Sequence, residues 1–197
     1  TSNVTDMEGL FYKMKDFNED ISAWNTSKVE DMLSMFEDAD NFNQALNNWD
    51  VSKVKTMKNM FRGAISFNQP LNKWNVGEVM DMEEMFEAAY KFNQNINSWN
   101  VSKVKNMSYM FNSAKEFNQP LDKWDVSSVE NMTCMFRYTK KFNQALNSWN
   151  VSKVKYMEEM FYDAESFNQS LNRWNVSNVK NMARMFCDAK KFNQDLS

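Results

Sequence analysis

The sequence predicts an α/β solenoid: a right-handed, curved coil of eight units, each with one short parallel strand and one short helix. Two observations predict this class. Phenylalanine recurs every 25 residues from Phe17 to Phe192, and all seven tryptophans recur with the same period from Trp24 to Trp174. A fixed period of this length is typical of stacked units that bury their apolar faces against each other. Within each unit, helical spacing of apolar residues is followed by strand-like spacing.

The expected helix follows from the apolar positions of one unit, for which residues 151–175 serve as the example. Apolar side chains recur there at spacings that place them on one face of a helix; they are Val154, Met157, Met160, Phe161 and Ala164. Ser152 precedes the first of them, where an N-cap is expected, and serine recurs at this place in most other units. The pattern predicts a helix of about twelve residues that ends near Ala164.

A turn and a strand complete the predicted unit. Asn168 follows the expected helix and has a counterpart in all eight units. Asparagine tolerates left-handed backbone and its side chain bonds loop backbone groups, so we expect a hydrogen-bonded ladder of these residues. Next comes a short predicted strand in which Trp174 and Val176 point inward and Asn175 points outward. Because strands need less lateral room than helices, the coil is expected to curve with its strands inside.

Composition narrows the function classes. The chain has 197 residues, a net charge of −3 and no histidine. Such a charge is not typical of nucleic-acid binding, and no apolar run reaches the roughly 18 residues that a membrane span needs. Without histidine, a glycine-rich phosphate loop or a nucleophile motif, we expect no enzyme, no cofactor and no metal site. Cys134 and Cys187 lie two units apart at different repeat positions, so we expect them to stay unpaired.

The repeat also predicts the domain organisation. We interpret residues 1–197 as a single repeat domain of about eight 25-residue units without distinct caps. Phe11 and Leu196, near its two ends, occupy positions that a neighbouring unit covers elsewhere in the repeat. Because uncapped terminal units expose apolar surface, we expect weak end-to-end self-association.

Positions that differ between units are the candidates for binding a partner. Four of the six tyrosines fall in units five to seven, and tyrosine is favoured in protein contacts; they are Tyr109, Tyr138, Tyr156 and Tyr162. Alternate units have lysine pairs that suggest a stripe for an anionic surface polymer; in units five and seven these are Lys103, Lys105, Lys153 and Lys155. The alternatives are incidental exposed tyrosines and a solvated lysine surface that neighbouring carboxylates balance.

A weaker period of 50 residues lies on top of the period of 25. Pro70 and Pro120 are related by this longer period, as are Lys73 and Lys123 in the same units. The simplest interpretation is that pairs of units were duplicated.

The combined string L-x-x-W-x-V-S-x-V-x-x-M-x-x-M-F-x-x-A-x-x-F-N-Q resembles the bacterial surface protein repeat, a BspA-like variety of leucine-rich repeat. The resemblance extends over all eight units. It implies a cell-surface or extracellular solenoid that binds a protein or glycan in the manner of an adhesin, and it implies no catalytic residue. A purely structural spacer within a longer surface protein is the alternative.

Overall fold

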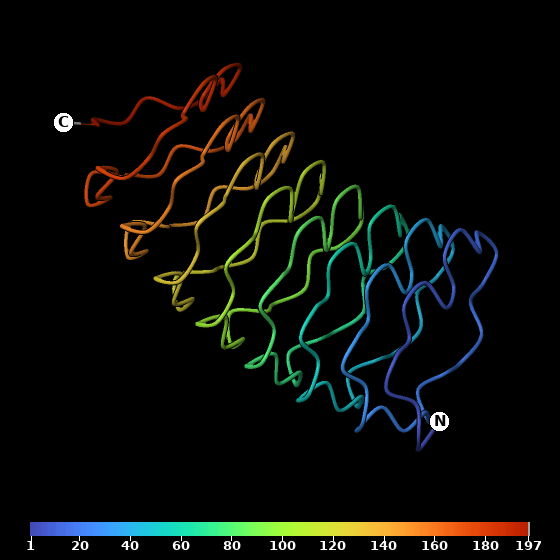
Figure 1. Ribbon diagram of the computed structural model, residues 1–197. Helices are drawn as coiled ribbons and strands as arrows, with labels where there is room; N and C mark the ends of the chain where they lie inside the picture. The colour runs from blue at the N-terminus through green and yellow to red at the C-terminus, as the bar shows by residue number, and fades with distance from the viewer. Residues whose placement is uncertain (197) are drawn as a thin grey trace.

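The computed structural model describes residues 1–196 as a stack of eight chain turns, with the two ends of the chain at opposite ends of the stack (Figure 1). Ser197, the last residue of the expected domain, lies outside the described residues. Positions are numbered here from 1 to 25 within each unit, starting at Thr1. Seven isolated parallel bridges join position 6 of successive units; they link Asp6, Asp31, Thr56, Asp81, Asn106, Asn131, Tyr156 and Asn181 in that order.

The expected strand-plus-helix unit is wrong. Residues 1–196 contain no helix and no strand longer than a single bridge. In the unit of residues 151–175, Glu159 and Asp163 have φ angles of 52° and 51°. Two left-handed residues, four apart, are incompatible with a right-handed helix. The α/β class and the curvature argued from helix width therefore do not apply.

Consecutive β-turns produce the apolar spacing that resembled a helix. The N–H of Met160 donates to the carbonyl of Met157 at 3.2 Å, and the N–H of Ala164 donates to that of Phe161 at 3.1 Å. These bonds join residues three apart, as in turns, whereas an α-helix joins residues four apart. The left-handed residue is the third of each turn, which is the type II arrangement. Apolar residues thus recur every three positions because they begin and end turns.

Hydrogen bonds between units run through the segment that was expected to be a helix. The N–H groups at positions 7, 9, 11 and 13 each donate to a carbonyl 24 residues further along the chain. Between units five and six, for example, Tyr109 donates to Thr133 at 2.8 Å and Ser113 donates to Arg137 at 2.8 Å. This pairing satisfies buried backbone groups that would otherwise destabilise a fold without regular secondary structure.

The serine that was expected to cap a helix takes part in a different motif. In the unit that begins at residue 151, Oδ1 of Asn150 accepts the N–H of Ser152 at 3.1 Å. The same Asx turn recurs at Asn25, Asp50, Asn75, Asn100, Asp125 and Asn175. The asparagine therefore organises this corner, and the expected helix-capping role of the serine is wrong.

The aromatic core agrees with the sequence. The tryptophans form an internal column: Trp49 to Trp149 are buried, whereas Trp24 and Trp174 at its ends are half-buried. In five of the six neighbouring pairs, the rings stack nearly parallel at 6.3–6.5 Å. Each internal indole N–H donates to a carbonyl 28 residues earlier, as Trp99 does to Leu71 at 3.0 Å. The predicted column is confirmed.

Two further sequence predictions are confirmed, and one is partly wrong. The asparagine ladder is present, because the N–H of each such asparagine donates to Oδ1 of its counterpart one unit earlier. Cys134 and Cys187 are both free. At the ends, Leu196 is 58% exposed as expected, but Phe11 is buried.

Candidate binding surface

The outward side chains at positions 6, 8, 9, 12 and 13 form a surface that we call the variable face, because its residues differ in chemistry between units. At position 9, for example, the chain has Glu84, Tyr109, Cys134 and Arg184. The turns create this surface, since positions 9 and 13 are the left-handed residues of each unit. The face is acidic, with thirteen Asp or Glu residues against five Lys or Arg.

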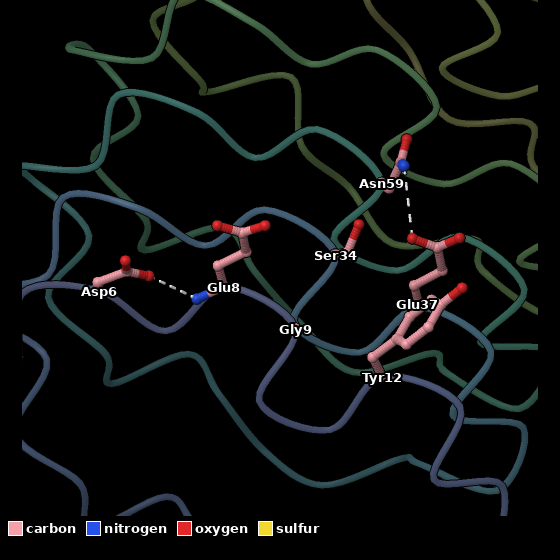
Figure 2. Close-up of a pocket in the computed structure, with 7 residues that line it drawn as sticks. All are labelled: Asp6, Glu8, Gly9, Tyr12, Ser34, Glu37 and Asn59. Atoms are coloured by element: carbon pink, nitrogen blue, oxygen red, sulfur yellow. Dashed lines mark hydrogen bonds between the residues drawn. The ribbon is translucent and has the colours of Figure 1, made fainter.

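An open pocket of 790 Å³ lies on the variable face of the first three units. Figure 2 shows its seven lining residues: Asp6, Glu8, Gly9, Tyr12, Ser34, Glu37 and Asn59. Tyr12 is 44% exposed and, like Glu37, lines this pocket. The Asn59 amide donates to Glu37 at 3.4 Å, but its buried Oδ1 has no partner among the described residues. The pocket thus offers carboxylates and one exposed aromatic ring, whereas the Asn59 oxygen is buried.

An arginine organises the middle of the face. Nη1 of Arg62 lies 2.7 Å from a Glu37 oxygen, and its Nε lies 2.9 Å from Glu84 and 3.1 Å from Glu87. Burial, together with the neighbouring Glu87 carboxylate, raises the pKa of Glu84 to about 7. Three carboxylates around one guanidinium leave this region acidic and sensitive to pH.

Two of the four predicted tyrosines come together around an arginine. The rings of Tyr138 and Tyr162 meet edge to face with centroids 5.6 Å apart. The Arg137 guanidinium lies 4.6 Å from the Tyr138 centroid and 5.3 Å from that of Tyr162. Its Nε also lies 3.0 Å from a Glu159 oxygen. We call these four residues the Arg137 cluster.

The other two predicted tyrosines lie apart from this pair. Tyr109 is half-buried, and burial with a hydrogen bond to Cys134 raises its pKa to about 12. Tyr156 occupies the bridged position 6 and is 43% exposed. The four tyrosines therefore share the variable face without forming one site.

The predicted lysines lie on a different surface, and carboxylates neutralise two of them. Nζ of Lys103 lies 2.6 Å from a Glu78 oxygen, and Nζ of Lys155 lies 2.6 Å from Glu130. Within residues 1–196, Lys105 and Lys153 form no ion pair. Lys153 and Lys155 line a 330 Å³ pocket whose other residues are Glu130, Asn178 and Lys180.

Sequence reasoning missed Arg62 and Arg137, which hold the two polar networks of the variable face together. Both stand at position 12, where the other units have glutamate, asparagine, tyrosine or cysteine. The variation at this position was a usable signal. The missing information was the spatial relation of position 12 to position 9 of the following unit, which the turns create and a helix would not.

Comparison with known proteins matches the chain to one protein family. The sequence profile of the family described as "Mycoplasma protein of unknown function, DUF285" matches residues 1–98, 46–136 and 81–197, which together cover the whole chain. No curated protein matches the chain. Among solved structures, an internalin (InlF) from Listeria monocytogenes matches with 7% identity and a TM-score of 0.25, over 85% of this chain and 71% of that one. Residues 1–196 contain no helix that is long and apolar enough to cross a membrane.

Proposed function

We propose a recognition function for the variable face, starting from the fact that this chain belongs to the DUF285 family, whose description assigns no function. In this proposal the chain is a binding module that contacts a protein partner through the outward residues of its turns. The repeat's resemblance to bacterial surface protein repeats supports display at a cell surface. The finer assignment to BspA-like adhesins belongs to the same proposal.

The Arg137 cluster is the observation that supports this function most strongly. Arginine and tyrosine are the side chains enriched where alanine substitution costs most binding energy in protein interfaces. Here Arg137 lies against two tyrosine rings and is also paired with Glu159, so its side chain is already ordered. An ordered cluster loses less side-chain entropy when it binds, which favours affinity.

The charge of the face indicates the kind of partner. Its excess of carboxylates would repel an acidic surface and attract a basic one. The pocket of Figure 2 adds the exposed carboxylates of Asp6 and Glu8. A protein segment with lysine or arginine side chains would complement both features.

The test compares two tyrosine substitutions on beads coated with the chain. Binding would be measured to a panel of purified surface and extracellular-matrix proteins. The Tyr138→Ala/Tyr162→Ala variant should lose at least about tenfold in affinity for any protein that binds the unmodified chain. Tyr90→Ala is the matched control, because Tyr90 is 38% exposed and lies outside the variable face.

The spacer alternative has an observation of its own. Most charged groups of the variable face already have partners within the stack, as Arg62 does, and a stack of this regularity suits a rigid connector. Equal binding by both tyrosine variants, or no binding to any protein of the panel, would favour the spacer.

A further inference from the structure

A second surface is opposite in charge to the variable face. The outward residues at positions 22 to 25 and 1 to 5 form what we call the basic edge, which has eleven Lys or Arg residues against six Asp or Glu. Positions 14 to 21 have seven of each. The chain's net charge of −3 is therefore the sum of an acidic surface and a basic surface. A partner near one of these surfaces meets the charge of that surface and not the net charge of the molecule.

Three cations on the basic edge stand in a row with a period of 50 residues. Lys73, Lys123 and Arg173 occupy position 23 of every second unit, and all three side chains are exposed. Among the described residues, none of these three forms an ion pair or a side-chain hydrogen bond. Some lysines elsewhere, such as Lys140 and Lys141, are paired with carboxylates, whereas Lys105 and Lys153 are also unpaired within residues 1–196. The three charges of the row are thus available to a ligand.

The same hydrogen bonds fix the backbone at each residue of the row. Oδ1 of Asn97 accepts the backbone N–H of Lys123 at 3.1 Å, and its amide donates to Asp122 at 2.9 Å. Asn147 makes the equivalent bonds to Arg173 and Asn172, each 3.0 Å long. Asn47 does so with Lys73 and Asn72, also at 3.0 Å. The period of 50 in the sequence is therefore a structural period, because this asparagine arrangement occurs at every second interface.

Each of the last two cations lines a polar pocket. One pocket, of 460 Å³, includes Asn97, Ser98 and Lys123. The other, of 300 Å³, includes Asn147, Ser148 and Arg173, which are the residues 50 positions further along. An amide, a hydroxyl and an unpaired cation thus recur together along the stack. Amides and hydroxyls bond sugar hydroxyls, and the cation attracts a carboxylate.

The spacing of the row favours a sparsely charged polymer. Stacked tryptophan rings of neighbouring units lie 6.3–6.5 Å apart, so two units advance by roughly 10–13 Å. A nucleic acid strand presents a phosphate about every 3.4 Å, and a duplex a charge about every 1.7 Å. Single-stranded nucleic acid also needs exposed aromatic rings on which bases stack. The tryptophans are the basic edge's aromatic residues, and most of them are buried.

We propose that the row of Lys73, Lys123 and Arg173 binds an acidic polysaccharide that lies along the stack, with one carboxylate near each cation. Sugar hydroxyls between the carboxylates contact the amides and hydroxyls of the intervening units, including Ser98 and Ser148. This site is separate from the variable face, so protein binding and glycan binding occupy different surfaces of one chain. The side-chain bonds of Asn47, Asn97 and Asn147 fix the backbone of the three row residues, and this sets the spacing between them.

The experiment uses hyaluronan, an acidic polysaccharide with one carboxylate per disaccharide, and its carboxyl-reduced neutral form. Affinity is measured by calorimetry on the whole 197-residue chain at about 20 mM salt, where screening is weak. The row variant is Lys73→Gln/Lys123→Gln/Arg173→Gln. The control is Lys91→Gln/Lys115→Gln/Lys191→Gln, which removes three charges from exposed side chains outside the basic edge.

We expect the unmodified chain to bind hyaluronan and not its neutral form, the row variant to bind at least about tenfold more weakly, and the control to stay within about twofold. Equal weakening of the two variants would overturn the site, since only total charge would then matter. Failure of the unmodified chain to bind hyaluronan would overturn the ligand class. So would tighter binding to oligo-dT or to phosphatidylserine vesicles. None of these outcomes depends on the Arg137 cluster, so the test is independent of the proposed protein binding.

Discussion

The backbone N–H of Asn143 donates to the side-chain Oδ1 of Asn118, one unit earlier, at 2.9 Å. The same oxygen accepts the side-chain amide of Gln144, also at 2.9 Å. One side chain therefore satisfies two donors of the next unit. Because the pattern recurs along the stack, the F-N-Q element of the repeat is a hydrogen-bonding device between units as well as a turn.

This relationship predicts that Asn118→Ala destabilises the chain by about 1–3 kcal/mol, because a backbone donor and an amide lose their acceptor. Glu116→Ala is the neighbouring control. It removes only an exposed ion pair with Lys141, which is worth about 0–1 kcal/mol. Urea unfolding of both variants measures the difference. Equal midpoints would show that the asparagine ladder contributes no stability.

The tryptophan column predicts a difference between its middle and its end. The indole of Trp99 is buried and donates to Leu71, whereas the indole N–H of Trp24 has no partner within residues 1–196. Trp99→Phe should therefore cost about 1–3 kcal/mol through the lost bond and lost volume. Trp24→Phe should cost less than half of that in the same unfolding assay. A larger cost at Trp24 would contradict the bonding pattern of the column.

Glu84 predicts a pH dependence of stability. Its pKa in the folded chain is raised from 4.5 to about 7, so between these values the folded state holds the proton more tightly than the unfolded state. The corresponding stability is present below the unfolded pKa and is lost as the pH rises through the folded pKa. Glu84→Gln should flatten the decline in stability between about pH 5 and 8.

A second carboxylate serves as the control for this pH prediction. Hydrogen bonds from Lys140 and Lys190 lower the pKa of Glu165 to about 2. Its contribution is lost only as the pH falls below its unfolded value, so Glu165→Gln should leave the slope between about pH 5 and 8 unchanged. Thermal unfolding over a pH series measures both variants. An unchanged slope in Glu84→Gln would remove the proposed role of Glu84.

Self-association remains a prediction for this 197-residue chain. Val176, Met182 and Leu196 are 38%, 40% and 58% exposed in the last unit, where they surround part of an apolar pocket. Exposed apolar side chains at positions that the repeat elsewhere buries favour contact with another copy. Sedimentation at rising concentration should show association, and Val176→Lys/Met182→Lys should reduce it. A strictly monomeric unmodified chain at high concentration would contradict the prediction.

The sequence predicted what depends on the period and missed what depends on backbone conformation. The tryptophan column, the asparagine ladder and the unpaired cysteines follow from repeat position alone. The helix was wrong because apolar residues three apart fit a helix face and a series of turns equally well. Glycine would have marked the left-handed positions, but of the sixteen residues at positions 9 and 13 only Gly9 and Gly63 are glycine. In units one to seven, bonds between units, which single-unit reasoning ignores, hold twelve of the other fourteen residues in that conformation.

Contacts between units were also missing from the sequence-based prediction of the candidate site. The tyrosines were visible as variable residues, and Tyr138 and Tyr162 do meet. Their arginine and the row at position 23 were not predicted as binding groups, because both require knowing which positions of successive units lie together. From the sequence, Lys73 and Lys123 were recognised only as residues that follow the longer period. The physical basis of that period is the bond from the amide of Asn97 to Asp122, together with the equivalent bonds of Asn47 and Asn147.

The most direct test of the turn-based fold is the sign of one substitution. Ala88 has a φ angle of 53° and would fall inside the helix that the spacing suggests. In a left-handed turn, Ala88→Gly relieves a conformational cost of about 1–2 kcal/mol, so we expect higher stability in urea unfolding. The neighbouring Ala89 is buried and has no positive φ, so Ala89→Gly should destabilise. If Ala88→Gly instead destabilises by about 1 kcal/mol, as expected where the backbone is right-handed, the turn-based account is contradicted.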